Sequence, residues 1–190
     1  VTASDPTFGG ILSSTEGLIR PEQIAVRAAA IKATYTSSVG TRRLPTLMAE
    51  PLASRIRQDA GEYGATTRRP RDIAHIDLPC LRFFMAVSGA THLALTHLDI
   101  AYPDTPLKVC AAYAGGRDYR PDQAYLDTVT PEYLELPSWD GRAVAGARAL
   151  ADLPLAARQY VAFLTGALGV APLFGTTGPQ REALISWLPD

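Results

Sequence analysis

The chain has 190 residues, of which 47% are hydrophobic and 19% are charged, and its formal net charge is -1. This length and composition predict a single domain over residues 1–190 with one sizeable core. A nearly neutral chain lacks the broad basic field that nucleic acid or an anionic membrane surface requires, and no apolar stretch approaches the ~20 residues of a membrane span, so neither partner is expected.

The first half of the chain is predicted to alternate helices with polar loops. Ser, Thr and Gly are frequent up to about Arg20, which suits a loop that lines a ligand, and Pro21 is a good first residue of a helix. Apolar residues then recur at helical spacing in three segments, and Asp77 is expected to cap the last of them. The expected elements are a loop to Arg20, helices over 21–34 and 47–60, a polar loop over 64–77, and a helix from Asp77 that stops at Gly89.

The second half is predicted to alternate strands with helices. Short apolar runs are typical of buried strands, and a Pro- and Tyr-rich stretch is typical of loops with an edge strand. The expected elements are a strand over 92–100, its neighbour over 107–113, an edge strand around 133–136, a helix over 155–168, a strand over 170–174, a loop over 175–179 and a helix over 180–187. This alternation predicts an α/β fold.

The polar loop carries the densest group of anion-binding side chains in the chain. Thr66, Thr67, Arg68, Arg69 and Arg71 offer two hydroxyls and three guanidinium groups within a few residues. A guanidinium binds a carboxylate or a phosphate through two parallel hydrogen bonds, so the loop would suit an anionic substrate. A solvated basic surface loop has the same composition and remains an equal alternative.

Two predicted strands end in segments that could bind a purine base. Asp99 follows the strand over 92–100, and its carboxylate could accept two N–H donors such as guanine presents, with His97 lying over the base. After the strand over 170–174, the backbone of Thr177 and Gly178 and the ring of Pro179 could contact the edge and face of a base. The alternatives are a turn capped by Asp99 with His97 on the surface, and an ordinary strand-to-helix turn.

No pattern for a metal site or a nucleophile is present in the sequence. His75, His92 and His97 lack metal-ligand spacing, and neither GxxxxGK[ST] nor GxSxG occurs. Cys80 and Cys110 lie in apolar runs and are interpreted as buried, reduced thiols, which favours a cytoplasmic protein.

Six segments in one order resemble the adenylosuccinate synthetase family. They are 1–10, similar to VTSSNPTAGG; 35–46, similar to YTxRVGxGPFPT; 64–71, similar to GATTGRPR; 95–99, similar to LTKLD; 108–113, similar to KVCVAY; and 176–181, similar to STGPDR. The resemblance implies the C-terminal part of a P-loop-NTPase-like α/β fold with a mostly parallel central sheet and flanking helices. It also implies that IMP, L-aspartate and GTP are converted to adenylosuccinate, GDP and phosphate with Mg²⁺ in a homodimer, as a step in AMP biosynthesis.

The resemblance further assigns roles to single residues. The implied IMP contacts are Thr2, Val39 and Arg69; the implied aspartate contacts are Ala65, Thr66, Thr67, Arg68, Arg69 and Arg71; the implied GTP contacts are Arg71, His97, Leu98, Asp99, Thr176, Thr177, Gly178 and Pro179. No catalytic residue and no metal ligand is expected within these 190 residues, because the family's phosphate loop, proton-accepting Asp and assisting His precede VTSSN. The chain alone is therefore expected to be inactive.

Two departures from the family pattern affect these expectations. Arg68 stands where the family has Gly and His97 stands where it has Lys, which bears on aspartate binding and on the preference for GTP. Two alternatives stay open at this point. One is a phage-type enzyme that acts on dGMP and forms 2-aminoadenylosuccinate, and the other is a non-catalytic nucleotide-binding or interaction module.

Overall fold

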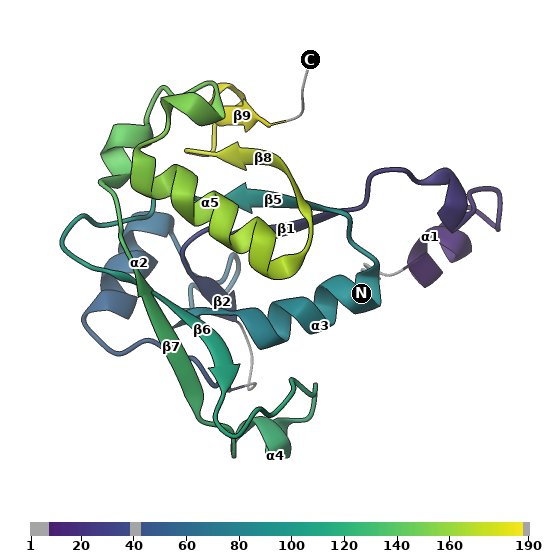
Figure 1. The fold of residues 1–190 in the computed structure, drawn as a ribbon, viewed down its shortest axis with the longest axis horizontal. Helices are drawn as coiled ribbons and strands as arrows, with labels where there is room; N and C mark the ends of the chain where they lie inside the picture. Colours follow the sequence, from purple (N-terminus) through teal and green to yellow (C-terminus); the bar gives the residue numbers. More distant parts are fainter. Residues whose placement is uncertain (1–7, 39–42, 188–190) are drawn as a thin grey trace.

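A computed structural model describes residues 8–38 and 43–187 of the chain (Figure 1). Its centre is a four-stranded sheet in the order β1-β5-β8-β9, in which β1, β5 and β8 are parallel and β9 is antiparallel to β8. The strands are β1 (Ala28–Lys32), β5 (His92–Thr96), β8 (Ala171–Thr176) and β9 (Leu184–Ser186). The predicted α/β fold with a mostly parallel sheet and flanking helices is confirmed.

Two helices build the main core together with this sheet, namely α3 (Leu78–Ser88) and α5 (Leu155–Leu168). Both match their predicted positions. Asp77 caps α3 by accepting a 3.0 Å hydrogen bond from the backbone N–H of Cys80, and Gly89 ends that helix in the left-handed conformation. Tyr160 and Leu164 of α5 are buried in one cluster with residues of β5, and α5 lies across the sheet in Figure 1.

Smaller elements surround this centre. A second sheet has the order β4-β6-β7, β2 pairs with β3 as an antiparallel ladder, and α2 packs near that ladder over a small core of Tyr35, Ile56 and Ile73. The bounds are β2 (Thr36–Ser38), α2 (Leu52–Ala60), β3 (Asp72–Ala74), β4 (Ile76–Asp77), β6 (Leu107–Tyr113) and β7 (Pro131–Leu136). The remaining elements are α1 (Phe8–Ser14), η1 (Pro21–Gln23), α4 (Gln123–Leu126), η2 (Gly141–Val144), η3 (Leu150–Asp152) and η4 (Arg181–Ala183).

The strands over 107–113 and 133–136 exist as β6 and β7, and β7 is an edge strand as predicted. The prediction that the first of them neighbours β5 is wrong. Both sides of β5 are occupied, by β1 and by β8, so β6 pairs instead with β4 and β7 in the second sheet.

Two predicted helices are wrong. The segment 21–34 forms only η1 before it becomes β1, because a five-residue pairing with β5 outweighs the helical spacing of its Ala and Ile side chains. The segment 180–187 forms η4 and then β9, where buried Ile185 alternates with exposed Leu184 and Ser186 and pairs with β8.

Several predicted boundaries also change. The strand expected over 92–100 ends at Thr96, and the strand expected over 170–174 continues to Thr176. The helix expected over 47–60 begins only at Leu52, because the N–H of Met48 donates to the carbonyl of Ile73 and holds its segment beside β3. The second half of the loop expected over 64–77 contains β3 and β4. The loop expected before Arg20 contains α1, which projects from the body in Figure 1; Leu12 of this helix and Leu18 beyond its end are exposed.

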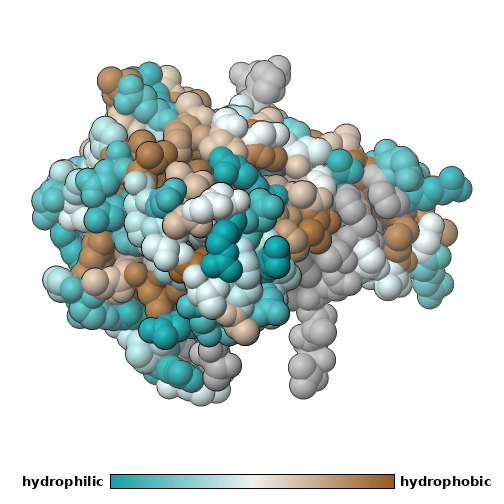
Figure 2. All heavy atoms as spheres, turned by 60° about the horizontal axis from the view of Figure 1, so that its bottom comes forward, coloured by the Kyte–Doolittle hydropathy of each residue, from teal (hydrophilic) through white to brown (hydrophobic). Residues whose placement is uncertain are grey.

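Figure 2 shows polar and apolar residues interspersed over one face of the molecule and over this projecting segment. None of the helices in the described part of the chain is long and apolar enough to cross a membrane.

Candidate functional site

The loops that follow β5 and β8 meet at one edge of the central sheet. The two strands are parallel neighbours, so their carboxyl ends lie side by side. The backbone N–H of Leu98 donates a 2.9 Å hydrogen bond to the carbonyl of Thr176. Two segments that the sequence singled out separately therefore belong to one structure.

A pocket of about 210 Å³ opens between these loops. Its lining consists of Asp59, Ala60, His97, Asp99, Ile100, Thr176, Gly178 and Pro179. Five of these residues were expected to contact a base. Asp59 and Ala60 come from the end of α2 and were missed, because nothing in the sequence indicates that this helix approaches the ends of β5 and β8.

Leu98 and Thr177 are buried next to residues that line the pocket. The Leu98 side chain is fully buried and lies so close to Gly175 that a Cβ there would come within 2.6 Å of it. Thr177 is buried, and its N–H and hydroxyl both donate to the carbonyl of Ala183. Neither residue is among those that line the pocket.

Asp99 is the most distinctive polar group of the pocket. Its Oδ1 atom is buried and has no hydrogen-bond partner among the described residues. A buried acceptor without a donor is costly, so such an atom marks a place where a ligand donor could bind. A carboxylate oxygen accepts N–H donors and repels acceptors, which gives the pocket a definite chemical preference.

The segment after β7 holds Asp99 in place. The indole N–H of Trp139 donates to the carbonyl of Leu98 at 2.9 Å, and the N–H of Gly141 donates to the carbonyl of Ala101 at 3.0 Å. Gly141 packs so tightly that a Cβ at this position would collide with the carbonyl of Asp99. A side chain larger than hydrogen is therefore excluded beside the pocket.

His97 stands in the left-handed backbone region, with φ of 59°. Its ring meets the ring of Tyr35 edge-on, with centroids 5.9 Å apart. Burial lowers the pKa of His97 below its ordinary value, although the nearby Asp99 carboxylate acts in the opposite direction. The imidazole is thus mostly neutral at neutral pH, where the family has a charged lysine.

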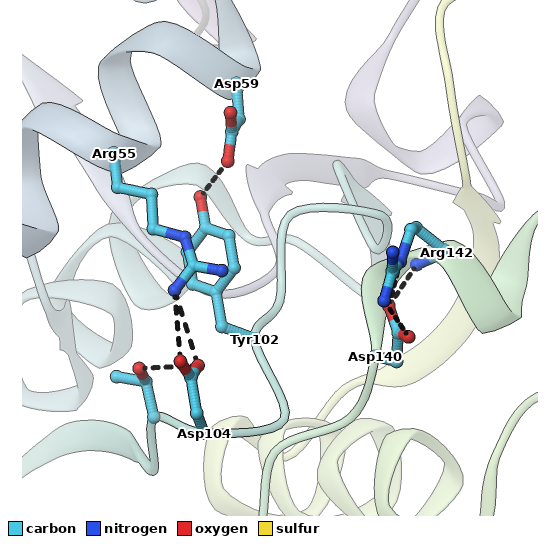
Figure 3. Close-up of polar contacts among 7 residues, drawn as sticks. Arg55, Asp59, Tyr102, Asp104, Asp140 and Arg142 are labelled. Atoms are coloured by element: carbon cyan, nitrogen blue, oxygen red, sulfur yellow. Dashed lines mark hydrogen bonds and ion pairs between the residues drawn. The ribbon is translucent and has the colours of Figure 1, made fainter.

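A second cavity of about 480 Å³ adjoins the pocket and shares Asp59, Asp99 and Ile100 with it. Figure 3 shows its polar contacts: the hydroxyl of Tyr102 donates to Asp59 at 2.7 Å, and the guanidinium of Arg55 lies 3.7 Å from the centre of the Tyr102 ring. These contacts fasten the end of α2 to the segment that follows Asp99. They explain how a helix distant in sequence reaches the pocket.

The basic loop lies on the surface, with Ala65, Thr66, Thr67, Arg68 and Arg69 all exposed. The N–H of Gly64 donates to the carbonyl of Arg69, and the N–H of Arg68 donates back to Gly64. Arg68 has φ of 54°, the conformation that favours the glycine found there in the family. The departure at this position therefore places backbone strain in the loop.

Arg71 differs from its neighbours because it turns inward to Glu62. Its Nη1 atom donates to Glu62 Oε2 at 3.0 Å. Glu62 is 3% exposed. Its carboxylate also pairs with the ammonium group of Lys32 and accepts a hydrogen bond from the hydroxyl of Tyr35. This buried carboxylate was not singled out in the sequence, because its partners lie on β1, after β1 and at the end of the loop, and no spacing rule connects them.

Thr2 and Val39 lie outside the described residues. Within the described part of the chain, no group of three or more His, Cys, Asp or Glu side chains could hold a metal ion. The described residues therefore offer no cluster of that kind for Mg²⁺.

Comparison with known proteins gives one consistent result. A sequence model described as adenylosuccinate synthetase matches residues 1–185. Adenylosuccinate synthetase 2 of Pseudoalteromonas translucida is 36% identical over 186 residues, which cover 97% of this chain and 43% of that protein. The adenylosuccinate synthetase of Salinibacter ruber is 35% identical over 190 residues, which cover 98% of this chain and 42% of that protein.

A solved structure gives the same likeness at the level of the fold. The fully ligated adenylosuccinate synthetase from Plasmodium falciparum superposes with a TM-score of 0.87 and 22% sequence identity, covering 99% of this chain and 45% of that one. The chain thus spans less than half the length of the relatives that it matches.

Proposed function

The chain belongs to the adenylosuccinate synthetase family, and from this premise we propose that it forms the guanine- and aspartate-binding part of an enzyme that joins L-aspartate to IMP while cleaving GTP. In this proposal the pocket between the loops after β5 and β8 receives the guanine base. The basic loop receives the carboxylates of aspartate, and Arg69 also contacts IMP together with Thr2 and Val39.

The observation that carries this proposal is the buried Oδ1 atom of Asp99, which has no hydrogen-bond partner in the described part of the chain. Guanine presents N–H donors at N1 and at its exocyclic amine, and a carboxylate can accept both. Adenine presents an acceptor at N1, which would face the carboxylate unfavourably. His97 and Pro179 line the same pocket and would contact the faces of the base.

The basic loop supports the aspartate part of the proposal. The exposed hydroxyls of Thr66 and Thr67 and the guanidinium of Arg69 are available to a dicarboxylate from solvent. Arg71 lies at the end of the loop and is held by Glu62. Its positive charge would therefore attract a carboxylate bound at the loop. Positioning of this kind would hold the amine of aspartate beside the purine and so lower the activation free energy of their reaction.

The wider setting is also part of the proposal. GTP serves as a co-substrate, Mg²⁺ binds through residues other than those described here, and the protein works as a cytoplasmic homodimer. The free thiols Cys80 and Cys110 suit a reducing compartment. We expect the 190 residues alone to bind nucleotide without forming product, because the family's phosphate loop, proton-accepting Asp and assisting His precede the segment that residues 1–10 resemble.

Calorimetry on the 190-residue chain tests the binding part. GDP is expected to bind at least about tenfold more tightly than ADP, which corresponds to about 1.4 kcal/mol. Equal affinities would contradict the guanine assignment. Product formation from IMP, L-aspartate and GTP by the purified 190-residue chain, above background, would contradict the expectation that it is inactive alone.

A further inference from the structure

Glu62 lies between the two regions that the proposed function assigns to different ligands. It follows α2 and directly precedes the basic loop, and its side chain is 3% exposed. Side chains that contact its carboxylate come from four places: Lys32 of β1, Tyr35 of the segment after β1, Ser37 of β2 and Arg71 at the end of the loop. A buried carboxylate with this many donors is rigidly oriented.

The carboxylate of Glu62 is ionised in this setting. Burial raises its pKa, but the hydrogen bonds from Lys32 and Tyr35 outweigh burial and hold the pKa below its ordinary value. Lys32 and Arg71 are themselves only partly exposed, at 22% and 34%. One negative charge therefore compensates two cations, and neutralising it would leave both without their partner.

On the side of the loop, Glu62 fixes Arg71 twice. The backbone N–H of Arg71 donates to the Glu62 carbonyl at 3.0 Å, and its Nη1 donates to the Glu62 carboxylate at 3.0 Å. The Nε atom of Arg71 is buried and has no partner among the described residues. The guanidinium thus keeps an unused donor while its orientation depends on Glu62.

On the side of the pocket, Glu62 fixes Tyr35. The hydroxyl of Tyr35 donates to Glu62 Oε1 at 2.7 Å, and the edge of its ring contacts His97, which lines the pocket. Lys32 lies 5.2 Å from the centre of the same ring. A continuous set of contacts therefore runs from Arg71 through Glu62 and Tyr35 to His97.

We propose that Glu62 is a positioning residue that couples binding of a carboxylate ligand at the basic loop to binding of a guanine nucleotide at the pocket. The inference rests on the proposed function, because it presumes both ligands. When Arg71 shifts toward a bound carboxylate, its pair with Glu62 weakens, and Glu62 then interacts more strongly with Tyr35 and Lys32. The rings of Tyr35 and His97 shift when the contacts of Glu62 change. Because coupling between two binding sites is reciprocal, each ligand changes the affinity of the protein for the other by the same factor.

The test measures the GDP dissociation constant of the full-length protein with IMP present, once without L-aspartate and once with L-aspartate at saturation. For the unaltered protein the two constants are expected to differ by about fivefold or more, the lower end of common coupling strengths. Glu62→Gln keeps the shape of the side chain but removes its charge. Its two constants are expected to agree within about twofold, which is within measurement error for a ratio near one.

A matched control is Glu135→Gln. Glu135 pairs with Lys108 at 3.2 Å on the surface of β7, and it lines neither the pocket nor the loop. This variant also removes the charge of a paired carboxylate, at an exposed position, and should keep the coupling of the unaltered protein. A ratio of two affinities does not respond to a general loss of stability, so a purely structural role of Glu62 would leave it unchanged.

Each outcome decides the question. A folded Glu62→Gln protein that retains the full coupling overturns the inference, and so does an unaltered protein that binds both ligands independently. If Glu62→Gln does not fold, Tyr35→Phe decides, because it deletes only the hydroxyl that joins Glu62 to the pocket side, and unchanged coupling in that variant overturns the inference. An unaltered protein that binds neither GDP nor L-aspartate contradicts the proposed function itself, which is a different and recognisable result.

Discussion

The backbone N–H of Leu98 and the carbonyl of Thr176 are joined by a 2.9 Å hydrogen bond, which ties the loop after β5 to the end of β8. The pocket opens between these two segments, and both Asp99 and Gly178 line it. The positions of Asp99 and Gly178 therefore depend on the parallel pairing of β5 and β8. Substitutions of residues that line the pocket should therefore lower ligand affinity more than they lower the stability of the sheet.

Asp99→Asn is expected to weaken GDP binding. The amide replaces one acceptor oxygen with a donor that faces the N–H groups of guanine. Loss of a hydrogen bond to a charged group costs ~1.5–3 kcal/mol, or roughly 10- to 150-fold in affinity. Calorimetry with GDP and ADP checks this, and preference for GDP should fall.

Asp104→Asn is the matched control for that change. Asp104 is an exposed carboxylate in the adjoining cavity and pairs with Arg55, but it does not line the pocket. GDP affinity should stay within about twofold in this variant. Equal effects of the two substitutions would mean that Asp99 acts only through the net charge of the region.

Gly141→Ala is expected to destabilise the protein and to displace Asp99. A Cβ at position 141 collides with the Asp99 carbonyl, and overpacking of this kind costs about 1–3 kcal/mol. The midpoint of urea unfolding should fall, and GDP should bind more weakly to the fraction that is folded. Gly166→Ala is the control, because a Cβ on that helical glycine meets nothing within 4 Å. Loss of stability in Gly166→Ala as well would refute the steric explanation.

Arg69→Leu is expected to raise the aspartate KM of the full-length protein by about tenfold or more while stability changes by under ~0.5 kcal/mol. The side chain is exposed, so its loss should not disturb packing. Arg158→Leu, on the exposed face of α5, should change neither quantity. A large fall in melting temperature with normal aspartate kinetics would show that Arg69 is structural.

Arg71→Leu should behave differently from Arg69→Leu. Its loss leaves the buried Glu62 carboxylate with one cation fewer, which costs about 1–3 kcal/mol. Melting temperature and aspartate binding should therefore both fall. If only one of them falls, Arg71 serves either the fold or the ligand, but not both.

Arg68→Gly is expected to stabilise the loop. A non-glycine residue with φ of 54° carries a strain of about 1 kcal/mol, which glycine does not. Aspartate should also bind more tightly if the family's glycine is needed for close approach. Glu16→Gly is the control for strain alone, because Glu16 has φ of 51° far from the loop in sequence. If Arg68→Gly leaves aspartate binding unchanged, the extra guanidinium does not restrict the loop.

His75 should make the protein sensitive to acid. Burial, with a smaller contribution from Lys108, lowers its pKa from the ordinary 6.5 to about 4. Between these values the unfolded chain binds more protons than the folded one, so stability present above pH 6.5 is lost as the pH falls toward 4. His75→Phe keeps a ring against Tyr133 but cannot titrate. Urea midpoints at pH 7 and pH 4.5 should differ less for His75→Phe than for the unaltered protein, and equal differences would exclude His75 as the cause.

The sequence alone determined the elements whose signals are local. Asp77 and Gly89 delimit α3 because capping and the left-handed turn depend on neighbouring backbone groups. The period of α5 and the apolar run of β5 are equally local, and the fold class followed from them. The basic loop and the ends of β5 and β8 were recognisable because each is a continuous segment that resembles one family.

The tertiary structure alone decided what depends on contacts between distant segments. The residues of β1 satisfy a helical spacing, and they form a strand only because β5 offers them a partner. Asp59 enters the pocket because Tyr102 holds it, and Glu62 is buried because Lys32, Tyr35 and Arg71 converge on it. No spacing along the chain predicts such convergence, since strand pairing and the burial of a charge are settled by the total free energy of the packed chain and not by local propensity.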